Sequence, residues 1–247
     1  MSSVLQRPQA VVDYPTSDGR PMAETDLHRA IMMDVIETLQ GYFASQPDVY
    51  VSGNLMVYYV EGNPRVFRSP DVFVVRGVPN RERRLYKTWE EGKFPQVVIE
   101  ITSKSTSTED LEQKHDIYQD LWQVPEYFLF DPFEEYLSPS LIALRLADHV
   151  YEPIPAEDGR FFSEELGLYV YRDGRELAFW NPTTRQRVRR PDVVARMIAE
   201  QEREAAESRA ASAEARAAAE RAAREQLEAE LAALRRQLAA TPPPAEG

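Results

Sequence analysis

Hydrophobic and polar residues follow two different periods along the first half of this chain. Between Glu24 and Ala44 the apolar residues recur every three or four positions, which is the spacing of one helix face. Five short runs rich in Val, Ile, Tyr and Phe follow: VYVSG, LMVYYV, DVFVV, QVVIEI and EYFLFD. Gly, Pro and Asn separate the runs, as in the segment EGNP. This pattern predicts one helix followed by several strands.

A second helix is predicted between the fourth and fifth of these runs. The segment STSTEDLEQKHDIYQDLWQ begins with Thr106 and Glu109 at the spacing of a capping box. Two acidic residues lie in its first turn, where the helix dipole favours negative charge. The predicted order is therefore a helix, four strands, a helix and a strand.

Strand-like composition continues after Asp131. The runs LIALRL, HVYEPIP, LGLYVYR and ELAFWN are rich in β-branched and aromatic residues, with Gly-containing turns between them. They predict either an antiparallel extension of the sheet or a curled layer of hairpins. With the preceding elements they indicate an α/β fold.

The last part of the chain has a different composition. From Asp192 to Ala240, Ala, Glu and Arg dominate and Gly and Pro are absent, which predicts one long helix. Four leucines, Leu227, Leu231, Leu234 and Leu238, have the 4-3-4 spacing of a short coiled-coil seam. The helix is either a weak coiled coil or a solvated single helix. We expect a globular domain over 1–191, a helix over 192–240 and a disordered tail over 241–247.

The distribution of charge limits the partners that the chain can bind. Its 247 residues have a net charge of −12. The segment from Asp192 onward has 8 basic and 11 acidic residues, so the preceding part carries −9. Neither part has the positive field typical of proteins that coat nucleic acid. Contact with a polyanion then requires bound cations or a local basic patch. The segment RERRLYK, from Arg81 to Lys87, is either such a patch or a solvated loop.

Composition also indicates the cellular compartment. The chain has no cysteine, which excludes disulfides and thiolate metal ligands. No apolar run approaches the roughly 20 residues that a membrane helix needs. The first segment, MSSVLQRPQAVVDYP, lacks the apolar region of a secretory signal. We therefore expect a cytoplasmic protein that does not associate with a membrane.

Two acidic residues interrupt otherwise apolar strands. Asp71 begins the run DVFVV, and Glu100 lies inside QVVIEI. A carboxylate buried in a strand is costly unless a cation or hydrogen-bond donors compensate it. If the two strands are neighbours, the carboxylates converge at one edge and form a site for Mg²⁺ or Mn²⁺, with the carbonyl of Ile101 as a third ligand. The alternatives are a turn cap for Asp71 and a structural salt bridge for Glu100.

A lysine on the second predicted helix completes the candidate chemistry. Lys114 lies four residues after Asp110 and four before Tyr118, on one helical stripe. A lysine that points at the sheet can help to stabilise a pentacoordinate phosphate. Alternatively, Lys114 pairs with Asp110 or Glu109 on an exposed face, and Tyr118 belongs to the core. The three histidines, His28, His115 and His149, are too widely spaced for a zinc motif.

Several linked segments resemble a known family. PDVFVV, IEITSKSTSTEDLEQKHDIYQDLWQVPEYFLFDP, RRLYKTWEEGKFP and SEELGLYVY are similar to the Uma-two family of endonucleases, within the restriction-endonuclease-like PD-(D/E)XK superfamily. The resemblance covers about residues 13–190. It implies an αβββαβ core: a restriction-endonuclease-like mixed sheet flanked by helices, here with an antiparallel extension and a long C-terminal helix.

The resemblance also implies roles for particular residues. Asp71 and Glu100 would hold magnesium, and Glu24 matches an acid that many superfamily members supply from the first helix. The superfamily lysine normally lies two positions after the second acid, where this chain has Thr102. The resemblance implies that Lys114 replaces that lysine from the following helix. The catalytic set is then Asp71, Glu100, Lys114 and Glu24.

Three functions remain open at this point. The first is a homodimeric endonuclease that hydrolyses DNA phosphodiester bonds with magnesium-activated water and needs no organic cofactor. The second is a catalytically inactive nuclease-like fold that binds nucleic acid or a partner protein, a reading favoured by Thr102 and by the acidic body. In the third, the helical tail is the working part and serves as an oligomerisation or docking arm.

Overall fold

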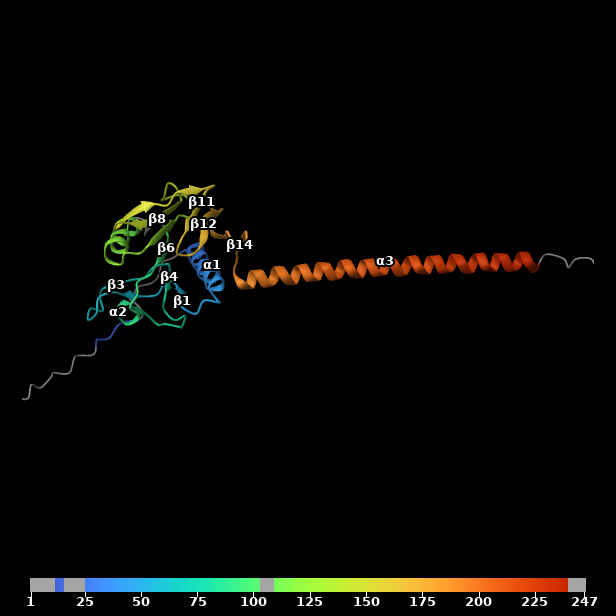
Figure 1. Ribbon diagram of the computed structural model, residues 1–247, viewed down its shortest axis with the longest axis horizontal. Helices are drawn as coiled ribbons and strands as arrows, with labels where there is room; N and C mark the ends of the chain where they lie inside the picture. The colour runs from blue at the N-terminus through green and yellow to red at the C-terminus, as the bar shows by residue number, and fades with distance from the viewer. Residues whose placement is uncertain (1–11, 16–24, 103–108, 240–247) are drawn as a thin grey trace, which may run out of the picture. The chain divides into compact units, whose positions relative to one another are not determined.

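The computed structural model describes residues 12–15, 25–102 and 109–239. The chain divides into two units, Met1–Pro191 and Asp192–Gly247 (Figure 1). The first contains the sheets and the candidate site. The second contains nearly all of one long helix.

A six-stranded mixed sheet forms the centre of the first unit, in the order β1-β4-β6-β7-β8-β9. Its strands are β1 (Val49–Ser52), β4 (Val72–Arg76), β6 (Val97–Ile101), β7 (Glu126–Phe130), β8 (Leu141–Ala147) and β9 (Val150–Pro153). Neighbours β6 and β7 run parallel, and the other pairs run antiparallel. A parallel pair needs a crossover, which the helical segment between β6 and β7 provides. The predicted αβββαβ core is therefore confirmed.

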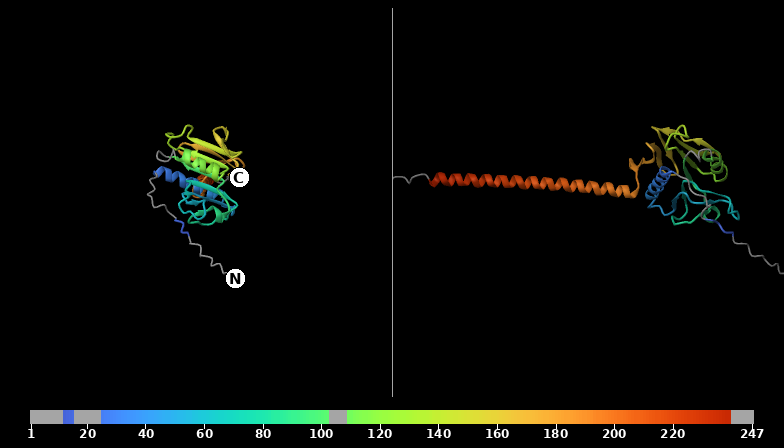
Figure 2. Two further views of the ribbon diagram at one scale, coloured as in Figure 1. Left: turned by 90° about the vertical axis from the view of Figure 1, so that its left-hand side faces the viewer. Right: turned by 180° about the vertical axis from the view of Figure 1, so that it is seen from behind.

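Helix α1 (Asp26–Tyr42) covers one face of this sheet. Thr25 caps its N-terminus, because the Thr25 side chain accepts a hydrogen bond from the His28 backbone N–H at 3.1 Å. Val35 and Leu39 are fully buried in the core that α1 shares with β4 and β6. The helical segment after β6 lies on the opposite side of β4 and β6, as Figures 1 and 2 show from different directions.

That second helical segment differs from the prediction. A capping box is typical of the N-terminus of an α-helix, whereas the structure has two π-helical stretches, η1 (Glu109–Lys114) and η2 (Ile117–Leu121). At the end of η2 the Trp122 N–H donates to the Ile117 carbonyl at 2.9 Å, a spacing of five residues. Thr106, the expected cap, lies outside the described residues. Short π-helical insertions are frequent near functional sites.

Both arrangements left open for the region after Asp131 are present. Strands β8 and β9 extend the central sheet, and a separate antiparallel sheet has the order β10-β11-β12-β13-β14. Its strands are β10 (Ala156–Glu157), β11 (Arg160–Ser163), β12 (Leu168–Asp173), β13 (Glu176–Asn181) and β14 (Gln186–Val188). This second sheet packs into the α1 side of the core through Leu168, Val170, Leu177 and Phe179.

A third, smaller sheet lies on the other side, in the order β3-β2-β5. It consists of β2 (Val57–Tyr58), β3 (Phe67–Arg68) and β5 (Tyr86–Lys87), and the single-turn helix α2 (Thr88–Glu91) follows. The predicted strand LMVYYV is therefore β2, and it belongs to this sheet rather than to the central one.

A buried polar network joins the central and second sheets. The Glu126 carboxylate, almost fully buried, accepts hydrogen bonds from the Arg145 guanidinium at 2.9 Å, from the Glu164 backbone N–H at 2.8 Å and from the Ser163 hydroxyl. A buried carboxylate with this many donors is compensated. Glu126 is therefore explained as a structural residue.

Helix α3 (Pro191–Ala239) makes up the described part of the second unit. Arginine and glutamate pairs four residues apart, such as Arg203 with Glu207 and Arg224 with Glu228, lie along its surface. Leu227 and Leu231, from the predicted seam, are 64% and 48% exposed. Among the described residues, no helix has the length and apolar character to cross a membrane.

Candidate active site

Asp71 lies in a bend directly before β4, at the edge where β6 ends. Its side chain is largely buried, and its Oδ2 atom accepts a hydrogen bond from the Ile101 backbone N–H at 2.8 Å. This bond attaches the start of β4 to the last residue of β6. The carboxylate therefore does more than cap its own turn, because it bridges two strands.

The strand register brings the two predicted acids to one place. Val72 pairs with Ile99 and Phe73 pairs with Val98. Asp71 directly precedes the first paired residue of β4, and Glu100 directly follows Ile99 in β6, so the two acids lie at the same end of this strand pair. The strands that precede and carry the two acids are therefore neighbours in the sheet, as expected.

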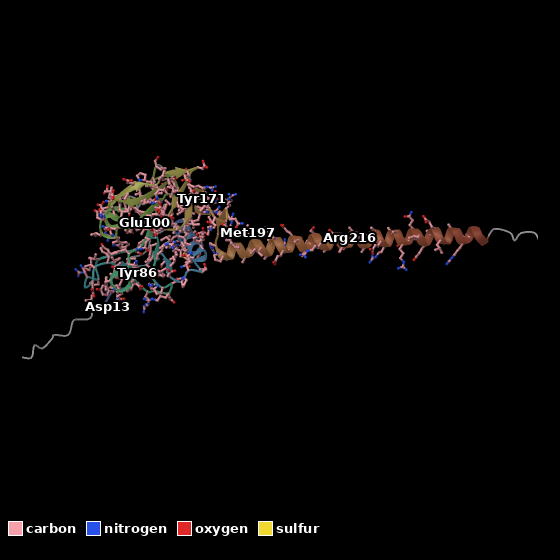
Figure 3. The ribbon with its side chains drawn as sticks, in the orientation of Figure 1. Asp13, Tyr86, Glu100, Tyr171, Met197 and Arg216 are labelled. Atoms are coloured by element: carbon pink, nitrogen blue, oxygen red, sulfur yellow. The ribbon has the colours of Figure 1, made fainter. Side chains whose placement is uncertain are left out.

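Glu100 is fully buried, and both its oxygens accept hydrogen bonds. The Lys114 ammonium donates to Oε2 at 2.8 Å, and the Tyr118 hydroxyl donates to Oε1 at 2.7 Å. Both donors come from the π-helical segment, four residues apart. Figure 3 shows Glu100 within the body of the first unit. Lys114 therefore reaches the carboxylate on the sheet, as its predicted stripe implied.

Ile101 presents its backbone to the same edge. In an extended strand, the N–H and the C=O of one residue point to the same side. Because the Ile101 N–H points at Asp71, its carbonyl also lies on the Asp71 side of β6. The next residue, Thr102, faces β7 instead. Its N–H and its hydroxyl both donate to the Phe130 carbonyl, at 2.8 and 3.3 Å.

His28 approaches the site from the first turn of α1. Its Nε2 atom lies 3.4 Å from Oδ1 of Asp71, and its side chain is 7% exposed. The sequence places His28 one turn after Glu24, without a catalytic assignment. Tyr118 is fully buried in the core, as predicted, and its position four residues after Lys114 also brings its hydroxyl to Glu100. Glu24, the fourth predicted catalytic residue, lies outside the described residues.

The donor set around Asp71 fits a hard divalent cation. An ionised carboxylate offers about four lone-pair sites, so an oxygen that accepts one hydrogen bond can still coordinate an ion. Mg²⁺ usually takes one or two carboxylates from a protein and keeps several waters. Within 12–15, 25–102 and 109–239, no group of three or more His, Cys, Asp and Glu side chains has the arrangement of a metal site. The candidate set is therefore two carboxylates and one carbonyl, which suits Mg²⁺ or Mn²⁺ only together with water.

A close approach of two backbones supports the position of Asp71. A Cβ atom added to Gly53, just after β1, would lie 1.9 Å from the Asp71 carbonyl oxygen and 2.7 Å from the Ile36 side chain. The following N–H, of Asn54, donates to the Pro70 carbonyl at 2.8 Å. Only glycine leaves room for this contact, so Gly53 helps to set where the Asp71 segment lies.

Most basic side chains of the segment RERRLYK pair with acidic side chains. Arg83 is 2% exposed, donates to both oxygens of Glu91 at 2.8 and 2.9 Å, and lies 4.1 Å from the centre of the Tyr50 ring. The Arg83 hydrogen bonds hold the pKa of Glu91 below its ordinary value. Arg81 also pairs with Glu91, and Lys87 pairs with Glu90. Arg83 is therefore a structural cation, whereas Arg81 and Lys87 take part in more exposed pairs that contribute little to stability.

The mixed sheet, with helical segments on both of its faces, is a restriction-endonuclease-like fold. The chain belongs to the Uma2 family, whose model carries the description "Putative restriction endonuclease" and matches residues 4–178. The predicted family is thereby confirmed.

Comparison with solved structures finds a similar chain. It is a crystal structure titled "a putative nuclease belonging to DUF820" from Anabaena variabilis ATCC 29413. The two chains are 15% identical with a TM-score of 0.44, and the match covers 58% of this chain and 75% of that one. No curated protein shows a significant match to this chain.

Proposed function

We propose that this chain is a Mg²⁺- or Mn²⁺-dependent endonuclease that hydrolyses phosphodiester bonds in DNA. The observation that carries the proposal is the buried Glu100 carboxylate, held between Lys114 and Tyr118 on the strand whose last residue, Ile101, is bonded to Asp71. If Glu100 formed only a structural ion pair with Lys114, a second acid, Asp71, would not be needed beside the neighbouring strand. Family membership supports the same reaction class.

Asp71, Glu100 and the carbonyl of Ile101 are the residues that would hold the ion. When bound, such an ion lowers the pKa of a water molecule and neutralises charge on the phosphate. Tyr118 and Lys114 fix the orientation of Glu100, because each donates to a different oxygen. Lys114 also places a positive charge beside the site, where it can stabilise the charge that develops on phosphorus-bound oxygens.

A second candidate is a nuclease-like fold that binds nucleic acid or protein without cleaving it. Thr102 supports it, since the lysine expected at this position is replaced by a side chain bonded to β7. The first unit is acidic overall, and Arg81 and Arg83 pair with Glu91. Both features argue against strong electrostatic binding to DNA.

The test is cleavage of supercoiled plasmid and of a labelled duplex oligonucleotide with Mg²⁺, with Mn²⁺ and with EDTA. We expect metal-dependent cleavage that falls about 100-fold or more in Asp71→Asn and Glu100→Gln. Glu112→Gln, an exposed acid on the same helical segment, is the matched control and should cleave normally. Undiminished cleavage by folded Asp71→Asn protein would remove the endonuclease assignment. Binding without cleavage in either metal would favour the second candidate.

A further inference from the structure

We propose that Arg68, at the end of β3, binds a backbone phosphate of the DNA strand, next to the phosphate that is cleaved beside Asp71. This inference rests on the proposed function, because it names a further contact with the same substrate. It supplies the local positive charge that an acidic chain needs in order to bind a polyanion.

Arg68 lacks the acidic partner that many other arginines of the first unit have. Arg83 pairs with Glu91, for example, and Arg145 pairs with Glu126. Within the part of the chain that the structure describes, no carboxylate forms an ion pair with Arg68, and its one hydrogen bond goes to a neutral backbone carbonyl. Its positive charge is therefore available to an anion from outside the protein.

The guanidinium group of Arg68 also has unused hydrogen-bond donors. Nη1 donates to the Phe67 carbonyl at 2.8 Å. Nε is buried and, among the described residues, neither Nε nor Nη2 has an acceptor. A buried donor without an acceptor costs free energy, so it calls for an explanation. The Nε and Nη2 hydrogens form a fork that matches two phosphate oxygens, and rotation of this partly exposed side chain would present the fork to DNA.

Arg68 and Asp71 belong to one short, anchored segment. Arg68 pairs with Val57 across β2 and β3. Two residues later, the Pro70 carbonyl accepts a hydrogen bond from the Asn54 N–H at 2.8 Å. Three residues of chain span at most about 11 Å, which limits the separation of the Arg68 and Asp71 Cα atoms. Successive phosphates of one strand are about 3.4 Å apart along the helix axis, so a phosphate near the one at Asp71 lies within reach of Arg68.

The Arg68 side chain lies on the same face of the small sheet as Val57, because residues directly opposite on antiparallel strands share a face. Val57 is fully buried in the core that also contains Tyr118. Arg68 is therefore on the side of the central sheet from which Lys114 and Tyr118 reach Glu100. Since β3 is an edge strand, Arg68 stays partly exposed there.

Fluorescence anisotropy of a labelled duplex oligonucleotide, with Ca²⁺ in place of Mg²⁺, measures the contact. Ca²⁺ also takes oxygen ligands. In Arg68→Gln we expect the affinity to fall about 10-fold or more, as for a lost hydrogen bond to a charged group. The slope of log K against log salt concentration should fall by about 1, the value for one phosphate contact. Arg68→Lys keeps the charge but not the fork, so we expect a wild-type slope and an intermediate affinity.

Arg160→Gln is the matched control. It removes the same charge from the second sheet, where the Arg160 guanidinium lies 4.9 Å from the centre of the Trp180 ring. Its affinity and salt slope should equal those of wild type.

Thermal unfolding separates a phosphate-binding arginine from a structural one. Arg68→Gln should keep the wild-type midpoint, since no ion pair is lost. Arg83→Gln, which loses the hydrogen bonds to both oxygens of Glu91, should unfold at a lower temperature. A fall in Arg68→Gln as large as that in Arg83→Gln would show that Arg68 is a structural arginine and would overturn the proposal.

Wild-type affinity and slope in Arg68→Gln would overturn the phosphate contact, and so would an equal change in Arg160→Gln. Neither result affects the endonuclease assignment, which the cleavage assay with Mg²⁺ and Mn²⁺ decides. A wild type that binds the duplex through Arg68 but never cleaves it would support the phosphate contact and remove the endonuclease assignment. A wild type without affinity for the duplex would overturn the phosphate contact.

Discussion

The Ile101 backbone N–H donates to Oδ2 of Asp71 at 2.8 Å, so a side chain before one strand is bonded to the last residue of its neighbour. The acid is therefore positioned by β6, which also carries Glu100, rather than by its own loop. Asp71 and Ile101, two proposed ligands of the candidate site, are thus joined directly at the end of β6. Displacement of the Asp71 segment should consequently damage the whole site.

Gly53→Ala tests this dependence. The new methyl group would lie 1.9 Å from the Asp71 carbonyl oxygen, so the segment must move. We expect a loss of about 1–3 kcal/mol in the free energy of unfolding, typical of overpacking, together with at least a 10-fold loss of metal affinity. Urea unfolding and calorimetric titration measure the two effects.

Gly159→Ala is the control for the backbone. Gly159 has φ +74° and no atom within 4 Å of an added Cβ, so the change strains the turn by about 1 kcal/mol without touching the site. Its metal affinity should equal that of wild type. If Gly53→Ala protein also keeps full affinity, Gly53 does not set the position of Asp71.

Tyr118→Phe tests whether the Tyr118 hydroxyl stabilises and orients the Glu100 carboxylate. The variant removes a hydroxyl that donates to a fully buried carboxylate at 2.7 Å. Hydrogen bonds to charged groups contribute about 1.5–3 kcal/mol, and we expect a destabilisation in that range. Metal affinity should fall as well, because one oxygen of Glu100 loses its orientation.

Tyr151→Phe is the matched comparison. The Tyr151 hydroxyl donates at 3.0 Å to the carbonyl of Val124, a neutral acceptor. Its removal should cost only about 0.5–1.5 kcal/mol and leave metal affinity unchanged. Equal losses of stability and of affinity in the two variants would argue that Tyr118 is an ordinary core residue.

The sequence predicted the parts of the candidate site whose pattern is contained within one short segment of the chain. An acid inside an apolar, β-branched run is visible locally, and this was enough to single out Asp71 and Glu100. Lys114 followed from helical spacing. The proximity of His28 to Asp71 was not predicted, because it arises only when α1 packs across the sheet and brings together residues 43 positions apart in the chain.

Two other features could not be predicted for equally physical reasons. An amphipathic pattern hardly distinguishes an α-helix from a π-helix, so the sequence predicted only a helix after β6. The pairing of the RERRLYK arginines could not be predicted, because their partner Glu91 is the last residue of the short helix α2 and comes near them only when that helix forms. Strands of two residues, such as β3 and β5, are too short to show any alternation.

The Arg83–Glu91 pair predicts a pH dependence of stability. The pKa of Glu91 is lowered from its ordinary 4.5, mainly by hydrogen bonds from Arg83. The unfolded chain therefore binds the proton more readily than the folded one. The stabilisation is complete above pH 4.5 and is lost as the pH falls through the lower, folded pKa.

Urea unfolding of wild type and Glu91→Gln between pH 7 and pH 3 measures this. The difference in free energy should be constant above about pH 5 and shrink below pH 4.5. Glu90→Gln, which removes an exposed partner of Lys87, should differ little from wild type at any pH. A difference for Glu91→Gln that does not change with pH would contradict the lowered pKa.

The leucines of α3 give a prediction for the oligomeric state. A closed dimer would supply the two active sites that a double-strand cut requires, and Leu227 and Leu231 are exposed at seam positions. We expect the full-length protein to be a dimer in light scattering coupled to size exclusion. Leu227→Ala with Leu231→Ala should shift it to the monomer mass.

Because both leucines are exposed, this double variant should leave the thermal unfolding of the sheet-containing unit unchanged. Glu225→Ala, off the seam on the same helix, is the control and should remain dimeric. A wild-type monomer would show that α3 is a solvated single helix, stabilised by pairs such as Arg224 with Glu228. A dimer that survives the double variant would place the interface on another surface, since the seam would then contribute nothing to association.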